Sequence, residues 1–136
     1  MQLRSFDEVL AHLASIEAAD RPGLGWALAH CAQSLEFSVT GFPTQKPAWF
    51  QKTIGRIVLG RFLKRGAMSH DTHAPIPGAA DVDRGTSVAA GAQRLRAAIA
   101  LFRGHSGPLA PHVVYGPVDR PGYEAVHTMH IANHLG

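Results

Sequence analysis

Apolar residues recur every three or four positions along most of this chain, the spacing that places them on one face of an α-helix. Such segments cover about residues 6–18, 23–40, 48–64, 86–103 and 123–135. The first opens with Ser5-Phe6-Asp7-Glu8, a capping-box pattern typical of a helix start. Glycine and proline punctuate the stretches between the segments, as expected for turns. The pattern predicts an all-α fold, a helical bundle with more than half of its residues in helix and essentially none in strand.

The segment at about residues 48–64 has an apolar side and a basic side. The apolar side chains expected to face inward are Phe50, Ile54, Ile57, Val58, Phe62 and Leu63. The basic side chains expected to face outward, as a solvated surface, are Lys52, Arg56, Arg61 and Lys64. Residues 66–85 are rich in glycine, proline, alanine and aspartate with no clean period, so they predict a long connection. His70 and His73 lie in this connection and are expected to stay outside any site.

Length and composition limit the classes of protein that remain. The 136 residues predict one domain over 1–136, and the net charge of +3 is spread along the chain without a basic run, so nucleic-acid binding is unsupported. No apolar stretch approaches the ~20 residues that span a bilayer, and no signal-like segment follows Met1. Cys31 is the only cysteine, which excludes an internal disulfide. These features predict a cytoplasmic protein with no membrane partner.

The last helical segment carries the clearest chemical pattern. His127, His130 and His134 fall with Tyr123 within one narrow arc of the helix at about 100° per residue. His130 and His134 are one turn apart, close enough to bind a single metal ion, whereas His127 and His134 are two turns apart and too distant. Chance placement of surface histidines is the alternative, because the chain holds nine. Two histidines make an incomplete site, so a third ligand must come from elsewhere.

His30 is the best candidate for the third ligand. The segment at about 23–40 has an ordinary core stripe on one side and Trp26, His30, Gln33 and Phe37 on the other. A helix with two such faces is expected to pack between other elements rather than on the surface. His30 is the only ionisable group on that buried aromatic stripe. A histidine that is merely hydrogen-bonded in the core is the competing interpretation. Three neutral imidazoles from two helices would leave a coordination position open, as in catalytic metal sites.

Two end motifs resemble a known family. The segment Trp26-Ala27-Leu28-Ala29-His30-Cys31-Ala32-Gln33-Ser34-Leu35 with Gly41-Phe42-Pro43, and the closing His130-Ile131-Ala132-Asn133-His134-Leu135, are similar to the DinB-like superfamily of metal-dependent bundle proteins, in a bacterial branch named as a domain of unknown function. The resemblance implies a four-helix bundle of up-down-down-up order. It also implies a homodimer and a divalent metal, zinc or nickel, held by His30, His130 and His134. Relatives include thiol-dependent transferases and isomerases.

Two classes of function follow from these observations. One is a metal-dependent enzyme, a thiol-dependent transferase or a hydrolase, acting on a small molecule. The other is a metal- or ligand-binding sensor without turnover. The residues expected to line the pocket are Trp26, Gln33, Phe37, His112, Tyr115, Tyr123 and His127. His127, His112 and Tyr115 are either proton donors at the pocket mouth or ordinary surface and loop residues. Cys31 is expected to be a small core residue rather than a nucleophile.

Overall fold

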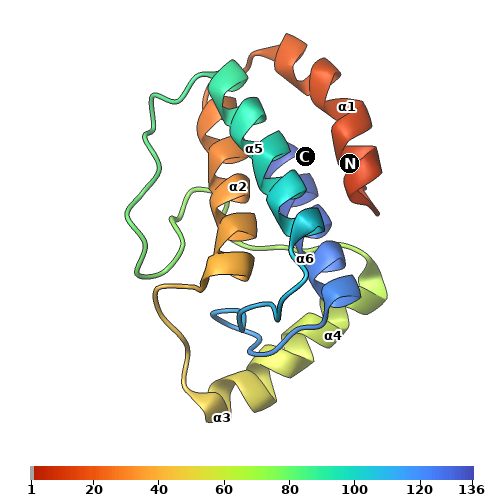
Figure 1. The fold of residues 1–136 in the computed structure, drawn as a ribbon, viewed down its shortest axis with the longest axis vertical. Coiled ribbons are helices and arrows are strands. Elements are labelled where there is room, and N and C mark those ends of the chain that lie inside the picture. The colour runs from red at the N-terminus through yellow and green to blue at the C-terminus, as the bar shows by residue number, and fades with distance from the viewer. Residues whose placement is uncertain (1) are drawn as a thin grey trace.

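The computed structural model describes residues 2–136, which fold into α-helices joined by turns and loops (Figure 1). The helices are α1 (Phe6–Ala19), α2 (Leu24–Thr40), α5 (Val88–Gly104), α6 (Arg120–Leu135) and a continuous rod made of α3 (Ala48–Phe50), the π-helical segment η1 (Gln51–Gly55) and α4 (Arg56–Arg65). Within the described range, β-pairing is limited to one isolated bridge between His112 and Gly116. The predicted all-α fold is therefore confirmed.

Side-chain caps fix where three of the helices begin. The Ser5 hydroxyl accepts a hydrogen bond from the Glu8 amide at 3.2 Å, as the capping-box pattern predicted. The Ser87 hydroxyl caps α5 in the same way. Asp119 caps α6, and its carboxylate accepts from the Gly122 amide at 2.8 Å. Each cap satisfies one amide that has no partner inside its helix, so the residues next to each start determine where the helix begins.

Four of the helices run roughly along one axis. In Figure 1, α1 and α6 run upward and α2 and α5 run downward. Helices α2 and α5 lie side by side, and glycines allow their close approach: a Cβ atom on Gly25 would lie 2.0 Å from the Thr86 carbonyl oxygen, and one on Gly91 would lie 2.4 Å from the Gly25 carbonyl oxygen. Alanine at either position would force the two backbones apart. Helix α6 packs against both α1 and α2, which places its histidine face beside α2.

The main core lies between α1, α2, α5 and α6. Its largest fully buried members include Phe6, Leu13, Leu28, Leu35, Leu95, Ile99, Phe102, Tyr123 and Ile131. Cys31 is buried in the same cluster, which agrees with the interpretation of this residue as a small core side chain. Burial also raises the pKa of its thiol, so the reactive thiolate is disfavoured.

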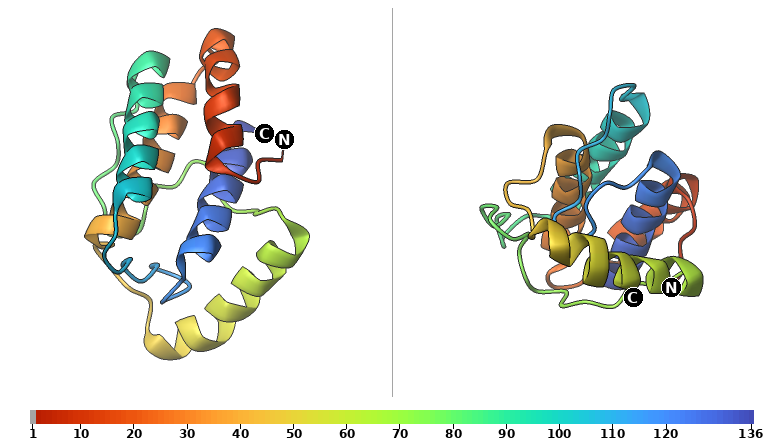
Figure 2. Two further views of the ribbon diagram at one scale, coloured as in Figure 1. Left: turned by 45° about the vertical axis from the view of Figure 1, so that its right-hand side comes forward. Right: turned by 90° about the horizontal axis from the view of Figure 1, so that it is seen from below.

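The rod formed by residues 48–65 lies across the lower end of the other helices (Figure 2), and here one prediction is wrong. Ile54, Ile57 and Leu63 were expected to face inward but are 46%, 57% and 41% exposed, whereas Leu59 is buried. The π-helical segment inserts an extra residue into the turn and rotates the following side chains relative to a regular helix. The rod also packs on α6 through one side only, so most of its surface meets solvent.

Residues 67–87 form the long irregular connection that the composition predicted. The connection is tied to α2 by side-chain hydrogen bonds: the Trp26 indole N–H donates to Asp81 at 2.9 Å, and the Gln33 amide donates to the Ala80 carbonyl at 3.2 Å. It therefore folds over the face of α2 that carries Trp26 and His30. None of the helices in residues 2–136 is both long and apolar enough to cross a membrane. The single-domain organisation and the cytoplasmic location stay predictions.

Candidate metal centre

Three buried histidines meet between α2 and α6. His30 comes from α2, and His130 and His134 come from successive turns of α6. One ring nitrogen from each lies within 4.8 Å of one from each of the others, and the ring centroids are 4.8–5.1 Å apart. All three side chains are at least nine-tenths buried. This cluster could hold a metal ion, and it unites the three residues that the sequence pattern selected.

Trp26 positions the His30 ring. The two side chains lie one turn apart on α2, and their rings are stacked with centroids 4.8 Å apart and planes 14° from parallel. The indole is in turn held by its hydrogen bond to Asp81. The Arg84 guanidinium also lies over the indole, with its central carbon 3.9 Å from the ring centroid. His30 is therefore oriented by packing with a ring that is itself fixed, which leaves both of its nitrogens free of protein partners.

The nitrogens of this cluster are unpaired. None of the ring nitrogens of His30, His130 and His134 makes a hydrogen bond within residues 2–136, and His30 Nδ1 and His134 Nε2 are also shielded from solvent. A buried polar atom without a partner costs about 1–3 kcal/mol, and native proteins rarely carry several together. A cation that accepts their lone pairs would remove this cost.

The same burial keeps the three rings neutral. Desolvation, followed by the proximity of His70, lowers the pKa of His30 to about 4. Desolvation and then the charge of His30 lower the pKa of His134 to about 3. The pKa of His130 is also held well below its usual range, chiefly by burial. At neutral pH all three imidazoles are therefore in the unprotonated form that binds metals.

His127 lies on the same arc of α6 but outside this cluster. Its Nε2 is 3.1 Å from the Ser38 hydroxyl oxygen, and that hydroxyl donates to the Leu35 carbonyl at 2.6 Å. The imidazole must therefore be the donor, with its proton on Nε2. Its ring stacks on Tyr123 and meets the edge of Phe102, and both His127 and Tyr123 are fully buried. These two residues form part of the core, so the predicted role of His127 at a pocket mouth is not supported by its position.

A cavity of about 300 Å³ opens beside the cluster, with His30 and His130 in its wall. His112 and Tyr115, both predicted pocket residues, line it too, and their rings are stacked with centroids 4.3 Å apart. Burial lowers the pKa of His112 to about 4 and raises that of Tyr115 to about 12. Most of the remaining wall is apolar: Phe42, Met68, Ala74, Pro75, Ile76, Pro77, Val113, Val114 and Val126.

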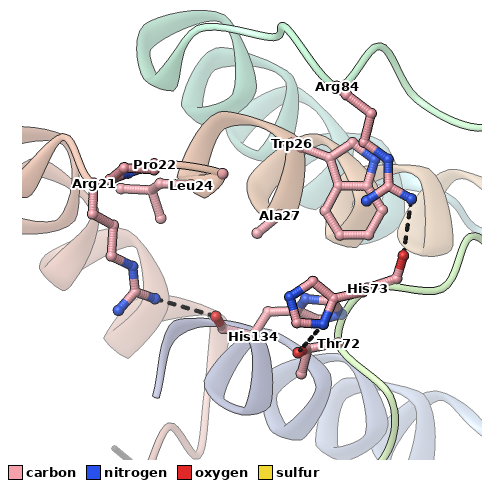
Figure 3. Close-up of a pocket in the computed structure, with 10 residues that line it drawn as sticks. Arg21, Pro22, Leu24, Trp26, Ala27, Thr72, His73, Arg84 and His134 are labelled. Carbon is pink, nitrogen blue, oxygen red and sulfur yellow. Dashed lines mark hydrogen bonds between the residues drawn. The ribbon is translucent and has the colours of Figure 1, made fainter.

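The other predicted pocket residues lie elsewhere. Phe37 packs against Phe42, outside the cavity wall, and Gln33 is committed to the Ala80 carbonyl. Trp26 lines a second cavity of about 260 Å³ on the far side of His134, shown in Figure 3 with Arg84 and His73. The side chains predicted to form one pocket are thus divided between two cavities, the core and, for Gln33 and Phe37, partly exposed positions outside both cavities.

Sequence reasoning missed His70. Its ring centroid is 4.9 Å from that of His130 and 5.4 Å from that of His134, and it lines the larger cavity with them. His70 lies in the connection as predicted, but its ring reaches the cavity beside the cluster, whereas His73 points largely into solvent with 89% of its side chain exposed. The connection has no hydrophobic period from which its path could be predicted. Only the high histidine count of the chain indicated that a further histidine could lie near the cluster.

The fold and the cluster define an all-helical protein with a buried three-histidine centre that could bind a metal ion. The chain matches, over residues 5–136, the model of the family described as "Protein of unknown function (DUF1569)", and it therefore belongs to that family. The predicted branch, a domain of unknown function, is confirmed at this level. No curated protein and no solved structure matches the chain.

Proposed function

We propose that this protein is a metal-dependent enzyme of the transferase or hydrolase type that acts on a small molecule at His30, His130 and His134. One observation carries the proposal: three neutral, buried imidazoles present unpaired nitrogens at one point, and two of them form the wall of a largely apolar cavity. Structural histidines normally pair at least one buried nitrogen within the protein, as His127 does through Nε2 with Ser38 while its Nδ1 has no partner, whereas none of the nitrogens of this cluster makes a hydrogen bond within residues 2–136. An arrangement that leaves them free favours a ligand that is a cation.

The donor set suits zinc or nickel. Neutral imidazole is a preferred ligand of both ions, and three histidines with an open position are a common catalytic zinc site. Two nitrogens on one tetrahedral zinc ion are about 3.4 Å apart, so loading would draw these rings together by up to about 1.4 Å. All three side chains sit on helices whose backbones are fixed by the core, and the adjustment requires rotation of the rings rather than refolding.

The direction of the helices supports a DinB-like four-helix bundle. Helices α1, α2, α5 and α6 follow the up-down-down-up order that the resemblance implies, and the rod of residues 48–65 is additional to them. The candidate ligands lie on the second and last of the four. We therefore propose membership of the DinB-like superfamily, with the metal between the facing helices.

The chemistry follows from the cavity. When bound, the ion would supply Lewis acidity that lowers the pKa of a water or thiol and makes a nucleophile at neutral pH. The largely apolar wall favours an uncharged organic group, while Tyr115 and His112 supply polar groups. The cavity lacks a glycine-rich phosphate loop or an arginine cluster, so a small molecule or thiol conjugate fits it better than a nucleotide.

Cobalt substitution tests the proposal. Cobalt(II) in a three-histidine site has visible bands that respond to the fourth ligand, so thiols or candidate electrophiles should shift the spectrum of the loaded wild-type protein. The His127→Ala variant is the matched control, because it removes a histidine of the same helix from outside the cluster. A spectrum that no compound in a broad panel changes would favour the alternative function, a metal-binding or sensing protein without turnover.

The rod of residues 48–65 supports the proposed homodimer. Trp49, Ile54, Ile57 and Leu63 are exposed on it, and such apolar side chains are commonly covered by a symmetric partner. The rod also carries five basic residues and no acidic one, so a two-fold interface would bring like charges together. Light scattering should give a dimer whose population rises with salt, and Ile57→Lys should give monomers. A monomeric wild-type mass at all salt concentrations would contradict the dimer.

A further inference from the structure

We propose that His70 is a fourth, displaceable protein ligand of the ion, delivered by the connection between α4 and α5. The proposal rests on the metal site proposed above and changes its description in one respect. The site would alternate between four histidine ligands and three, and the position that the substrate takes would be the one that His70 leaves.

The position of His70 is the first support. Its ring centroid is 4.9 Å from His130 and 5.4 Å from His134, distances close to the 4.8–5.1 Å that separate the three buried rings. It shares the wall of the larger cavity with His30 and His130. A fourth imidazole therefore lies at the solvent side of the cluster, where the open coordination position would be.

The hydrogen bond of the His70 ring is the second support. Its Nδ1 lies 2.8 Å from the Asp71 carbonyl oxygen, and because a carbonyl only accepts, Nδ1 carries the proton. The lone pair of His70 is consequently on Nε2, which makes no hydrogen bond within residues 2–136. A histidine that binds a metal through one nitrogen typically donates the other N–H to a carbonyl or carboxylate, so this ring already has the form of a ligand.

The backbone around His70 explains why this ligand can leave. The three buried histidines are fixed on helices, whereas His70 is exposed and lies in an irregular segment. Its carbonyl is contacted by the Asn133 amide at 3.5 Å, a long hydrogen bond. The firm attachments on either side are Met68, which is buried two residues before it, and the His73 carbonyl, which accepts from the Arg84 guanidinium at 2.8 Å. Withdrawal of His70 would break few contacts, so a substrate with a modest affinity for the ion can replace it.

Metal competition titrations test this proposal on the full-length protein. Zinc affinity should fall about 10–100-fold in His70→Ala, and the cobalt spectrum of the variant should differ from that of the wild type. His73→Ala is the matched control, since it removes an exposed histidine from the same connection and should change affinity less than twofold. Equal affinities and identical spectra for wild type and His70→Ala would overturn the proposal.

A measurement on the unmutated protein tests the proposal without the risk that a substitution disturbs folding. Long-range ¹H–¹⁵N spectra report each histidine nitrogen, and zinc should shift the Nε2 resonance of His70 together with one nitrogen from each buried ring. If the buried rings shift and His70 does not, the fourth-ligand proposal fails alone. If zinc shifts none of the four rings and His130→Ala binds as tightly as wild type, the metal site itself fails.

Discussion

The two halves of helix α6 use the same residue type for different purposes. In the first half, His127 is stacked between aromatic rings and donates its N–H to Ser38. In the second half, His130 and His134 face His30 and make no hydrogen bond within residues 2–136. All of these side chains are buried and all have lowered pKa values. Neither burial nor a shifted pKa therefore distinguishes a metal ligand from a core histidine.

What distinguishes the two halves is the partner across from each ring. Opposite His127 stands a hydroxyl that accepts a hydrogen bond from Nε2–H, so the imidazole has one partner in the core although its Nδ1 has none. Opposite His130 and His134 stands another imidazole, and a neutral ring could donate its N–H to a neighbouring ring, but none of these rings does so within residues 2–136. A cation shared by the three rings would satisfy one nitrogen of each at once, and the low pKa values disfavour protonation as the alternative.

The largest expected effect concerns metal affinity. His130→Ala should weaken zinc binding by about 1000-fold, roughly 4 kcal/mol, because it removes one of the three ligands. His127→Ala, one turn away on the same helix, should leave the affinity within about threefold. Competition with a chromophoric chelator measures both. Similar losses of zinc affinity in the two variants would contradict the distinction between the two halves of α6.

The reverse contrast is expected for stability. His127→Ala leaves a cavity among Tyr123, Phe102 and Ser38, and should lower the free energy of unfolding of the metal-free protein by about 2–4 kcal/mol. His130→Ala relieves a crowded set of unpaired nitrogens and should cost less. The exposed His12 provides a control that should stay within about 0.5 kcal/mol. Urea denaturation of chelator-treated protein checks the ranking, which fails if His130→Ala is the most destabilised.

A smaller effect is expected from pH. The folded state lowers the pKa of His127 to about 3 and of His112 to about 4, against about 6.5 in an unfolded chain. Between these values the unfolded chain binds more protons, so the metal-free protein should lose stability as pH falls below about 6.5. The slope is at most about 1.4 kcal/mol per pH unit for each such histidine. Removing the His127 imidazole should reduce the slope, and a flat profile between about pH 7 and 5 would contradict these pKa values.

Local signals in the sequence were sufficient for the helices and for the three-histidine cluster. Ser5 marked the start of α1, and the spacing of His130 and His134 fixed their common face because helical geometry is regular. His30 followed from a second stripe on α2. The positions of the helices and the faces that carry these histidines could therefore be predicted from residues only a few turns apart.

Features that depend on contacts between distant segments could not be predicted in this way. Ile54, Ile57 and Leu63 were misassigned to the buried side because a π-helical segment changed the phase of the pattern at Gln51–Gly55, although Val58 and Phe62 do pack inward. The closeness of the His70 ring to the cluster could not be predicted, because its segment has no period and its path is guided by hydrogen bonds with side chains such as Trp26 and Arg84. His127 fell on the correct face, but its assignment needed Ser38, 89 residues away.

The metal content of the protein, purified without a histidine tag, tests the central claim most directly. Native mass spectrometry with elemental analysis should find close to one divalent ion for each wild-type chain and none in the variant that combines His30→Ala, His130→Ala and His134→Ala. The His127→Ala chain should retain its ion. A wild-type protein that carries no metal and takes up none from zinc or nickel buffers, or a triple variant that binds as the wild type does, would contradict the account.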